Sequence, residues 1–156
     1  VIGFDKHLGS AFAKAHAGSG ERLPKTGKIF ISVNKLDKIK IIPIARDFQE
    51  LGFEIVATQG TSDLLSENGI LTNSIFKVGE GRPNVVDAIK NGEIQLVINT
   101  PLGAQSRFDE YEIGRASIRY KVIVITTISG AQAAVRGIRN LKSKTINYQS
   151  LQEIFA

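Results

Sequence analysis

The pattern of hydrophobic and polar positions divides most of this chain into short apolar runs separated by segments with helical spacing. Five runs contain few polar residues, which is typical of strands buried on both faces of a parallel sheet: 29–33, 53–57, 75–78, 95–99 and 121–126. The segments between and after them predict helices over 38–51, 62–68, 84–91, 111–120 and 131–141. This alternation predicts an α/β fold in three layers, an open five-stranded parallel sheet with helices on both faces.

The two ends of the chain have a different composition from this alternating part. Residues 9–17 are alanine-rich and predict a short helix, which Gly18-Ser19-Gly20 ends before a stretch of linker composition. We therefore expect 1–26 to be the tail of a preceding domain plus a linker, and 27–156 to be one globular domain. The chain starts with Val1 and has no methionine, so we expect a piece of a longer protein. A further short helix is predicted within 147–155.

Charge and composition narrow the range of functions. The net charge of +5 and the pI of about 9.6 indicate anionic partners. The basic residues are scattered, without a cluster interleaved with aromatics, which favours a small phosphate over nucleic acid. The chain has no cysteine and only two histidines, so no metal site and no catalytic thiol are predicted. No apolar run spans a bilayer and no signal-peptide pattern opens the chain, so we expect a cytoplasmic protein without membrane partners.

Candidate anion-binding residues follow the predicted strands. Thr58-Gln59-Gly60-Thr61 lies between a strand and a helix, where a turn brings backbone N–H groups, two hydroxyls and a helix N-terminus together. Parallel strands end at one edge of a sheet, where ligands bind, so residues after the other strands join this turn: Ser32, Lys38, Lys77, Asn99 and Thr100. Taken singly, these threonines cap helices and the lysines face solvent. Together they predict a phosphate site, with Asn99 directed at a sugar hydroxyl.

Standard catalytic motifs are absent from the sequence. Gly79-Glu80-Gly81 matches only the start of a dinucleotide fingerprint, and it follows the third strand rather than the first. There is no Gly-x-x-x-x-Gly-Lys-Ser/Thr loop and no Gly-x-Ser-x-Gly elbow. Neither a hydrolase nor a dehydrogenase is predicted.

Several longer motifs recur in the order and spacing of a known family. They are 30–33 (Phe-Ile-Ser-Val), 52–54 (Gly-Phe-Glu), 57–61 (Ala-Thr-Gln-Gly-Thr), 77–83 (Lys-Val-Gly-Glu-Gly-Arg-Pro), 90–93 (Lys-Asn-Gly-Glu) and 98–103 (Ile-Asn-Thr-Pro-Leu-Gly). With them the whole chain resembles the C-terminal regulatory domain of carbamoyl phosphate synthase large subunits, which is similar to methylglyoxal synthase. The resemblance implies a methylglyoxal synthase-like, Rossmann-like sheet. Residues 11–15 resemble the end of the preceding ATP-grasp half.

The resemblance implies a nucleotide monophosphate effector such as UMP or IMP. The resemblance implies that its phosphate is bound by Lys38, Thr58, Thr61 and Lys77, beside Ser32. The resemblance implies that its ribose or base is bound at Asn99, Thr100 and Pro101. The family pattern has threonine at the position of Pro101, and the change to proline removes a hydroxyl and a backbone N–H donor. The family also binds ornithine through a Tyr-Asp-Thr stretch near the fifth strand, of which only Thr126 remains as a possible second effector site.

The resemblance also implies a larger enzyme around this chain. The parent would be a ligase that makes carbamoyl phosphate from bicarbonate, glutamine-derived ammonia and ATP, for pyrimidine and arginine synthesis. ATP and Mg or Mn would bind in the parent, while this domain would hold no cofactor and no catalytic residue. Its protein partners would be the remainder of the large subunit and the glutaminase small subunit.

Three alternatives stay open at the level of sequence. Methylglyoxal synthase itself eliminates phosphate with the help of two aspartates, but Arg82 and Thr100 stand in their places, leaving only Asp109 or Glu110 as a substitute base. The basic pI suggests a nucleic-acid-binding module. The IMP cyclohydrolase domain of purine synthesis shares the Gly-Thr turn.

Overall fold

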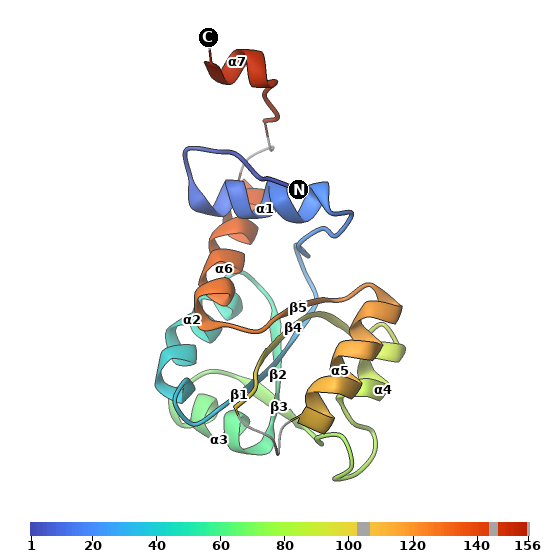
Figure 1. Ribbon diagram of the computed structural model, residues 1–156. Helices are drawn as coiled ribbons and strands as arrows, with labels where there is room; N and C mark the ends of the chain where they lie inside the picture. Colours follow the sequence, from blue (N-terminus) through green and yellow to red (C-terminus); the bar gives the residue numbers. More distant parts are fainter. Residues whose placement is uncertain (103–106, 144–146, 156) are drawn as a thin grey trace.

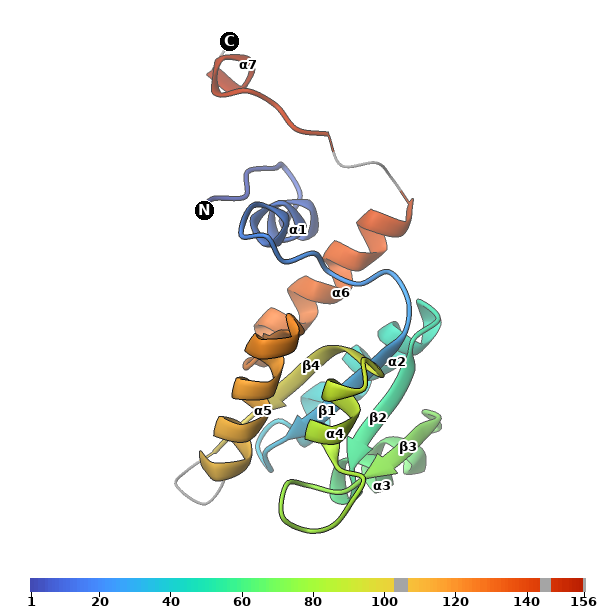
Figure 2. The same ribbon diagram turned by 90° about the vertical axis from the view of Figure 1, so that its right-hand side faces the viewer.

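The structure is a computed structural model that describes residues 1–102, 107–143 and 147–155. Five parallel strands form one sheet in the order β3-β2-β1-β4-β5, seen from two sides in Figure 1 and Figure 2. The strands are β1 (Lys28–Val33), β2 (Glu54–Thr58), β3 (Thr72–Ile75), β4 (Ile94–Thr100) and β5 (Ile123–Ile125). The predicted α/β fold with an open parallel sheet is confirmed.

Helices cover both faces of this sheet (Figure 1). The helices that do so are α2 (Lys38–Glu50), α3 (Gln59–Glu67), α4 (Val85–Lys90), α5 (Arg107–Tyr120) and α6 (Ile128–Ser143). The helices α1 (Leu8–Gly18) and α7 (Leu151–Phe155) lie beyond the end of the sheet. Side chains from α2, α3 and α6 pack with Ile29 and Ile31 of β1 in one hydrophobic cluster. Phe30 points to the other face and packs with α4 and α5 in a second cluster. The alternation along β1 thus builds the three predicted layers.

The helix α1 packs against α6, with the two backbones in close approach. A Cβ added at Gly9 would lie 2.6 Å from the carbonyl carbon of Arg136, and one at Gly137 would lie 2.9 Å from Leu23. Ala13 and Leu23 belong to the same cluster as β1. The predicted alanine-rich helix is confirmed, and the assignment of 1–26 to a preceding domain stays a prediction.

Several element boundaries differ from the sequence prediction. The third strand runs over Thr72–Ile75 and not 75–78, because this edge strand carries polar residues that an apolar pattern cannot mark. The helix α3 starts at Gln59 and not at Ser62, so the strand β2 leads directly into it without the predicted turn. The helix α5 starts at Arg107, which shortens the loop predicted for 100–110; residues 103–106 of that loop lie outside the described part.

A glycine with a positive φ angle follows the end of α2, of α3 and of α4. Gly52 and Gly69 have φ angles of 86° and 74°, a left-handed conformation that side chains with a Cβ rarely adopt. Within the described ranges, every helix is too short or too polar to cross a bilayer.

Candidate functional site

A cavity of about 510 Å³ opens at the edge of the sheet where β1, β2 and β4 end. In the strand order, the chain leaves β1 toward β2 and later returns to its other side with β4, and ligands of open α/β sheets bind at such reversals. Nearly all of the sequence-predicted site residues line it: Ser32, Lys38, Thr58, Thr61, Lys77, Asn99, Thr100 and Pro101. The structure therefore brings together side chains from the ends of β1, β2 and β4, from the starts of α2 and α3, and from the segment after β3.

Lys38 is anchored at the start of α3. It is the first residue of α2, and its Nζ donates to the backbone carbonyl of Gly60 and, at 3.0 Å, to the hydroxyl of Thr61. Burial lowers the pKa of Lys38, nearby Asp63 opposes that shift, and the charge of Lys77 adds to it. A cation that is partly desolvated in this way interacts strongly with an anion that enters the cavity.

The N-terminus of α3 has no side-chain cap from its own N-cap residue. Thr58 holds that position in extended conformation, but its hydroxyl donates to Ser32 Oγ at 3.4 Å instead of accepting from the helix. The first N–H groups of a helix have no intrahelical partner and carry a partial positive charge. Because Thr58, Gly60 and Thr61 all line the cavity, this helix end is directed at it.

The wall formed by the loop after β3 and by α4 and α5 combines a lysine with a carboxylate. Lys77 lies in the loop after β3, exposed, with its Nζ 3.7 Å from Glu80 Oε1. Asp109 lies in the first turn of α5, half-buried at the cavity. Burial raises the pKa of Asp109, Lys77 opposes this shift, and Glu80 adds to it. Sequence reasoning considered Asp109 only as a substitute base in a loop, and the earlier start of α5 is what places it here.

The end of β4 forms another wall of the cavity. Asn99 and Thr100 pair with Ser32 and Val33 of β1 in the parallel register, and both are buried. Thr126 lies apart from them, exposed just after the edge strand β5, and it does not line the cavity. The predicted second site is therefore not part of this cavity.

Asn34, Lys35, Val78, Val85 and Ile113 also line the cavity, although the sequence did not single them out. Asn34 and Lys35 belong to the turn between β1 and α2. The only indication of them in the sequence was the polar composition of this turn, since loops after strands often carry binding residues. In the part of the chain that the structure describes, no group of three or more His, Cys, Asp or Glu side chains is arranged to hold a metal ion.

Comparison with known proteins gives one consistent family. Residues 40–126 match the family described as MGS-like domain. The chain is 47% identical over 153 residues to the carbamoyl phosphate synthase large chain of a Nostoc species, covering 98% of this chain and 14% of that protein. It is 46% identical to the C-terminal section of the Aquifex aeolicus large chain, covering 99% of this chain and 30% of that protein.

A plant protein extends the comparison. The arginine-specific, chloroplastic carbamoyl phosphate synthase large chain of rice is 42% identical over 156 residues, covering 99% of this chain and 13% of that protein. The chain thus spans only a small fraction of the length of these relatives. The resemblance inferred from the sequence motifs is confirmed: this chain belongs to the family of MGS-like domains and is similar along its whole length to part of the carbamoyl phosphate synthase large chain.

Proposed function

We propose that this chain is an allosteric regulatory domain of a carbamoyl phosphate synthase large chain and that it binds a nucleoside monophosphate, UMP or IMP, in the cavity at the end of β1, β2 and β4. One observation carries the proposal. Lys38 and the uncapped N-terminus of α3 meet at the same point of the cavity, so a cation, a hydroxyl and backbone N–H groups face one anion. This donor set suits a phosphate monoester.

The phosphate would sit between Lys38 and the first turn of α3. Lys38 has three ammonium donors, two of which contact Gly60 and Thr61, which leaves one for the ligand. Thr61 would supply its hydroxyl, Thr58 would turn its O–H from Ser32 to the ligand, and Lys77 would approach from the opposite wall. Each charge-assisted hydrogen bond contributes roughly 1.5–3 kcal/mol, so two or three of them give a phosphate the main share of the affinity.

The sugar and the base would occupy the remainder of the cavity. Asn99 and Asp109 both line it, and an amide together with a carboxylate can bind the hydroxyls of a ribose. Val78, Val85 and Ile113 offer an apolar surface to a base. Pro101 lines the cavity without a hydroxyl or an N–H, so we expect less polar recognition at that point.

The relation of this chain to its relatives supports a regulatory role. The chain corresponds to about one seventh of a large chain, and none of its cavity residues forms a recognised catalytic motif. The synthesis of carbamoyl phosphate, with ATP and its metal ions, would belong to the remainder of the large chain and to the glutaminase subunit. Nucleotide binding would favour one of two conformations of the parent and so change its affinity or rate.

The half-buried carboxyl of Asp109 at the cavity supports a second candidate function, a phosphate lyase like methylglyoxal synthase. Arg82, which stands in place of one aspartate of that enzyme, is 81% exposed and pairs with Asp87, and it does not line the cavity. Asp109 is the one acid among the described residues that line the cavity, so it alone could remove a proton there. We expect no turnover of dihydroxyacetone phosphate. Turnover that Asp109→Asn abolishes would establish the lyase instead.

Calorimetric titration of the chain with UMP, IMP and ornithine tests the proposed function. We expect saturable binding of one mononucleotide, no heat from ornithine at the exposed Thr126, and loss of nucleotide binding in Lys38→Ala and Thr58→Val. Lys90→Ala is the matched control, because Lys90 is an exposed lysine at the end of α4 that does not line the cavity. If both site variants bind UMP and IMP like the parent chain, the proposed pocket is wrong.

A further inference from the structure

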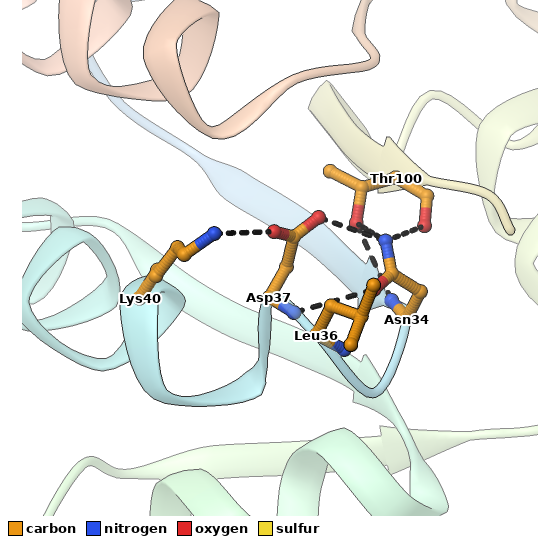
Figure 3. Close-up of polar contacts among 5 residues, drawn as sticks. All are labelled: Asn34, Leu36, Asp37, Lys40 and Thr100. Carbon is orange, nitrogen blue, oxygen red and sulfur yellow. Dashed lines mark hydrogen bonds and ion pairs between the residues drawn. The ribbon is translucent and has the colours of Figure 1, made fainter.

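Asn34 connects the end of β4 to the turn that leads into α2 (Figure 3). Its backbone N–H donates to the carbonyl of Thr100 at 3.2 Å, and its side-chain Nδ2 donates to that carbonyl at 3.1 Å. Nδ2 also donates to Asp37 Oδ2 at 2.8 Å, while Oδ1 accepts from the backbone N–H groups of Leu36 and Asp37 at 2.8 and 3.2 Å. One side chain thus fixes the turn internally and attaches it to the neighbouring strand.

The hydroxyl of Thr100 belongs to the same network. It accepts from the backbone N–H and from Nδ2 of Asn34 at 3.3 and 3.2 Å, and the proximity of this hydroxyl helps to lower the pKa of the Asp37 carboxyl. A threonine hydroxyl has two acceptor positions, and Asn34 occupies both of them. Thr100 is also only 4% exposed. Its hydroxyl is therefore held against the turn, and little of the residue is exposed to the cavity.

Asp37 links this network to the phosphate end of the cavity. It is the N-cap residue of α2, and the next residue in the chain is Lys38. Burial acts to raise the pKa of Asp37, but the polar groups of Thr100 and Asn34 and the charge of Lys40 outweigh it, so this pKa lies below its ordinary value. The carboxylate is accordingly ionised at neutral pH and accepts from Nδ2 of Asn34.

From this geometry we propose that Asn34, Asp37 and Thr100 form a clamp that holds the turn before α2 against the end of β4 and so positions Lys38 for the phosphate. Thr100 is then a positioning residue and does not contact the ribose or base, contrary to the expectation from sequence. The proposal rests on the proposed function, because it concerns the same site. It predicts that loss of the clamp weakens binding of any phosphate, whatever is attached to it.

Two probes, UMP and inorganic phosphate, separate positioning from direct contact. Affinities are measured for the parent chain and for Asn34→Ala, Thr100→Val, Thr100→Ser and the Asn34→Ala/Thr100→Val double variant. We expect Asn34→Ala and Thr100→Val each to weaken both probes by the same factor, roughly tenfold, the change for partial loss of one charge-assisted bond. Thr100→Ser keeps the hydroxyl and should restore most of the affinity. The double variant should bind no more weakly than either single variant, because both remove the same clamp.

Asn91→Ala is the matched control, because Asn91 is an exposed asparagine that bonds to Glu93 at the other end of β4. A Thr100→Val variant that loses affinity for UMP but keeps it for inorganic phosphate would overturn the proposal, since Thr100 would then contact the nucleoside. Additive losses in the double variant would also overturn it. If the parent chain binds neither probe, the proposed function fails instead. Urea denaturation of the same four variants then tests the clamp, and additive changes in unfolding free energy would overturn it.

Discussion

Among the helices that begin near the cavity edge of the sheet, α3 and α4 differ in how their first N–H groups are satisfied. At α4, Asn84 Oδ1 accepts from the N–H groups of Val86 and Asp87 at 3.0 and 3.3 Å, and Asp87 accepts in return from the Asn84 N–H at 3.1 Å. This is a complete capping box. At α3, Thr58 occupies the capping position but its hydroxyl faces Ser32.

The difference between the two helices shows at which helix start the N–H donors remain for a ligand. The capped end of α4 is satisfied by the protein itself and contributes stability. The end of α3 is accompanied by Lys38 and faces the cavity, so its unpaired donors and partial positive charge favour an anion there. The direction of the N-cap side chain thus distinguishes the start of α4, which the protein satisfies itself, from the start of α3, which faces the cavity.

The largest expected effect comes from giving α3 a charged cap. Thr58→Asp would place a carboxylate on the helix N-terminus and beside Lys38, where it occupies the donors and repels a phosphate. We expect calorimetry to show a loss of UMP affinity of about 100-fold or more, the equivalent of two charge-assisted bonds. Asn84→Asp, the same change toward aspartate at the capped helix, should leave affinity unchanged. Binding by Thr58→Asp at parental strength would contradict the comparison.

The next largest effect is expected from pH, because the protonation of Lys38 controls anion binding at the start of α3. Its pKa is lowered by burial, partly restored by Asp63 and lowered again by Lys77. The charged form binds the anion, so affinity is complete below the lowered pKa and declines as pH rises through it. A phosphate monoester is fully ionised well above pH 6, so the charge of the ligand phosphate does not change, and ribose 5-phosphate, which carries no base that titrates, serves as the probe. We expect its affinity to fall as the pH rises from neutral toward the ordinary pKa of a lysine.

Lys38→Arg is the control for that titration, because an arginine stays protonated throughout this range. Its affinity, whatever its starting value, should vary less with pH than that of the parent chain. Parallel profiles for the two proteins would show that Lys38 is not the titrating group.

Loss of the capping box of α4 should lower the stability of the protein and leave its affinity for UMP unchanged. Asn84→Ala is expected to lower the free energy of unfolding by about 1 kcal/mol, the usual cost of losing an N-cap, with UMP affinity unchanged. Thr58→Val is expected to change the free energy of unfolding less than Asn84→Ala does and to lower the affinity for UMP. Urea denaturation of both variants measures this. A Thr58→Val variant destabilised as much as Asn84→Ala would mean that Thr58 caps its helix after all.

The smallest expected effect concerns Lys77 across the cavity. Its ammonium lies 3.7 Å from Glu80, and both side chains are about half exposed. Exposed ion pairs are worth about 0.2–1 kcal/mol, so Glu80→Gln should release Lys77 and tighten UMP binding only about twofold. Glu93→Gln, a change at an exposed acid away from the cavity, serves as the control. Equal effects of the two changes would leave Lys77 without a direct part in binding.

The position of the site could be predicted from sequence because it depends on the order of elements. Alternating apolar runs and helical segments imply parallel strands, and parallel strands end at one edge. Lys38, Thr58 and Asn99 therefore had to lie near one another, whatever their side-chain conformations. The edge strand β3 was misplaced by three residues, because half of its surface is exposed and its composition is polar.

The local chemistry of the site could not be predicted in the same way. Whether Thr58 caps α3 or turns to Ser32 depends on one side-chain rotamer, and both outcomes fit the same sequence. The hydroxyl of Thr100 faces Asn34 and Asp37, which no spacing rule indicates. Asp109 reaches the cavity only because α5 starts earlier than its apolar spacing suggested. Each of these features depends on atomic packing between segments distant in sequence.

The central claim, that the N-terminus of α3 holds the phosphate, is tested most directly by amide nuclear magnetic resonance during titration with UMP. The account predicts that the amide signals of Gly60 and Thr61 shift and saturate together, while those of Val86 and Asp87 at the capped start of α4 shift much less. Gly60 and Thr61 signals that stay unchanged while UMP binds elsewhere, or shifts of equal size at both helix ends, would contradict it.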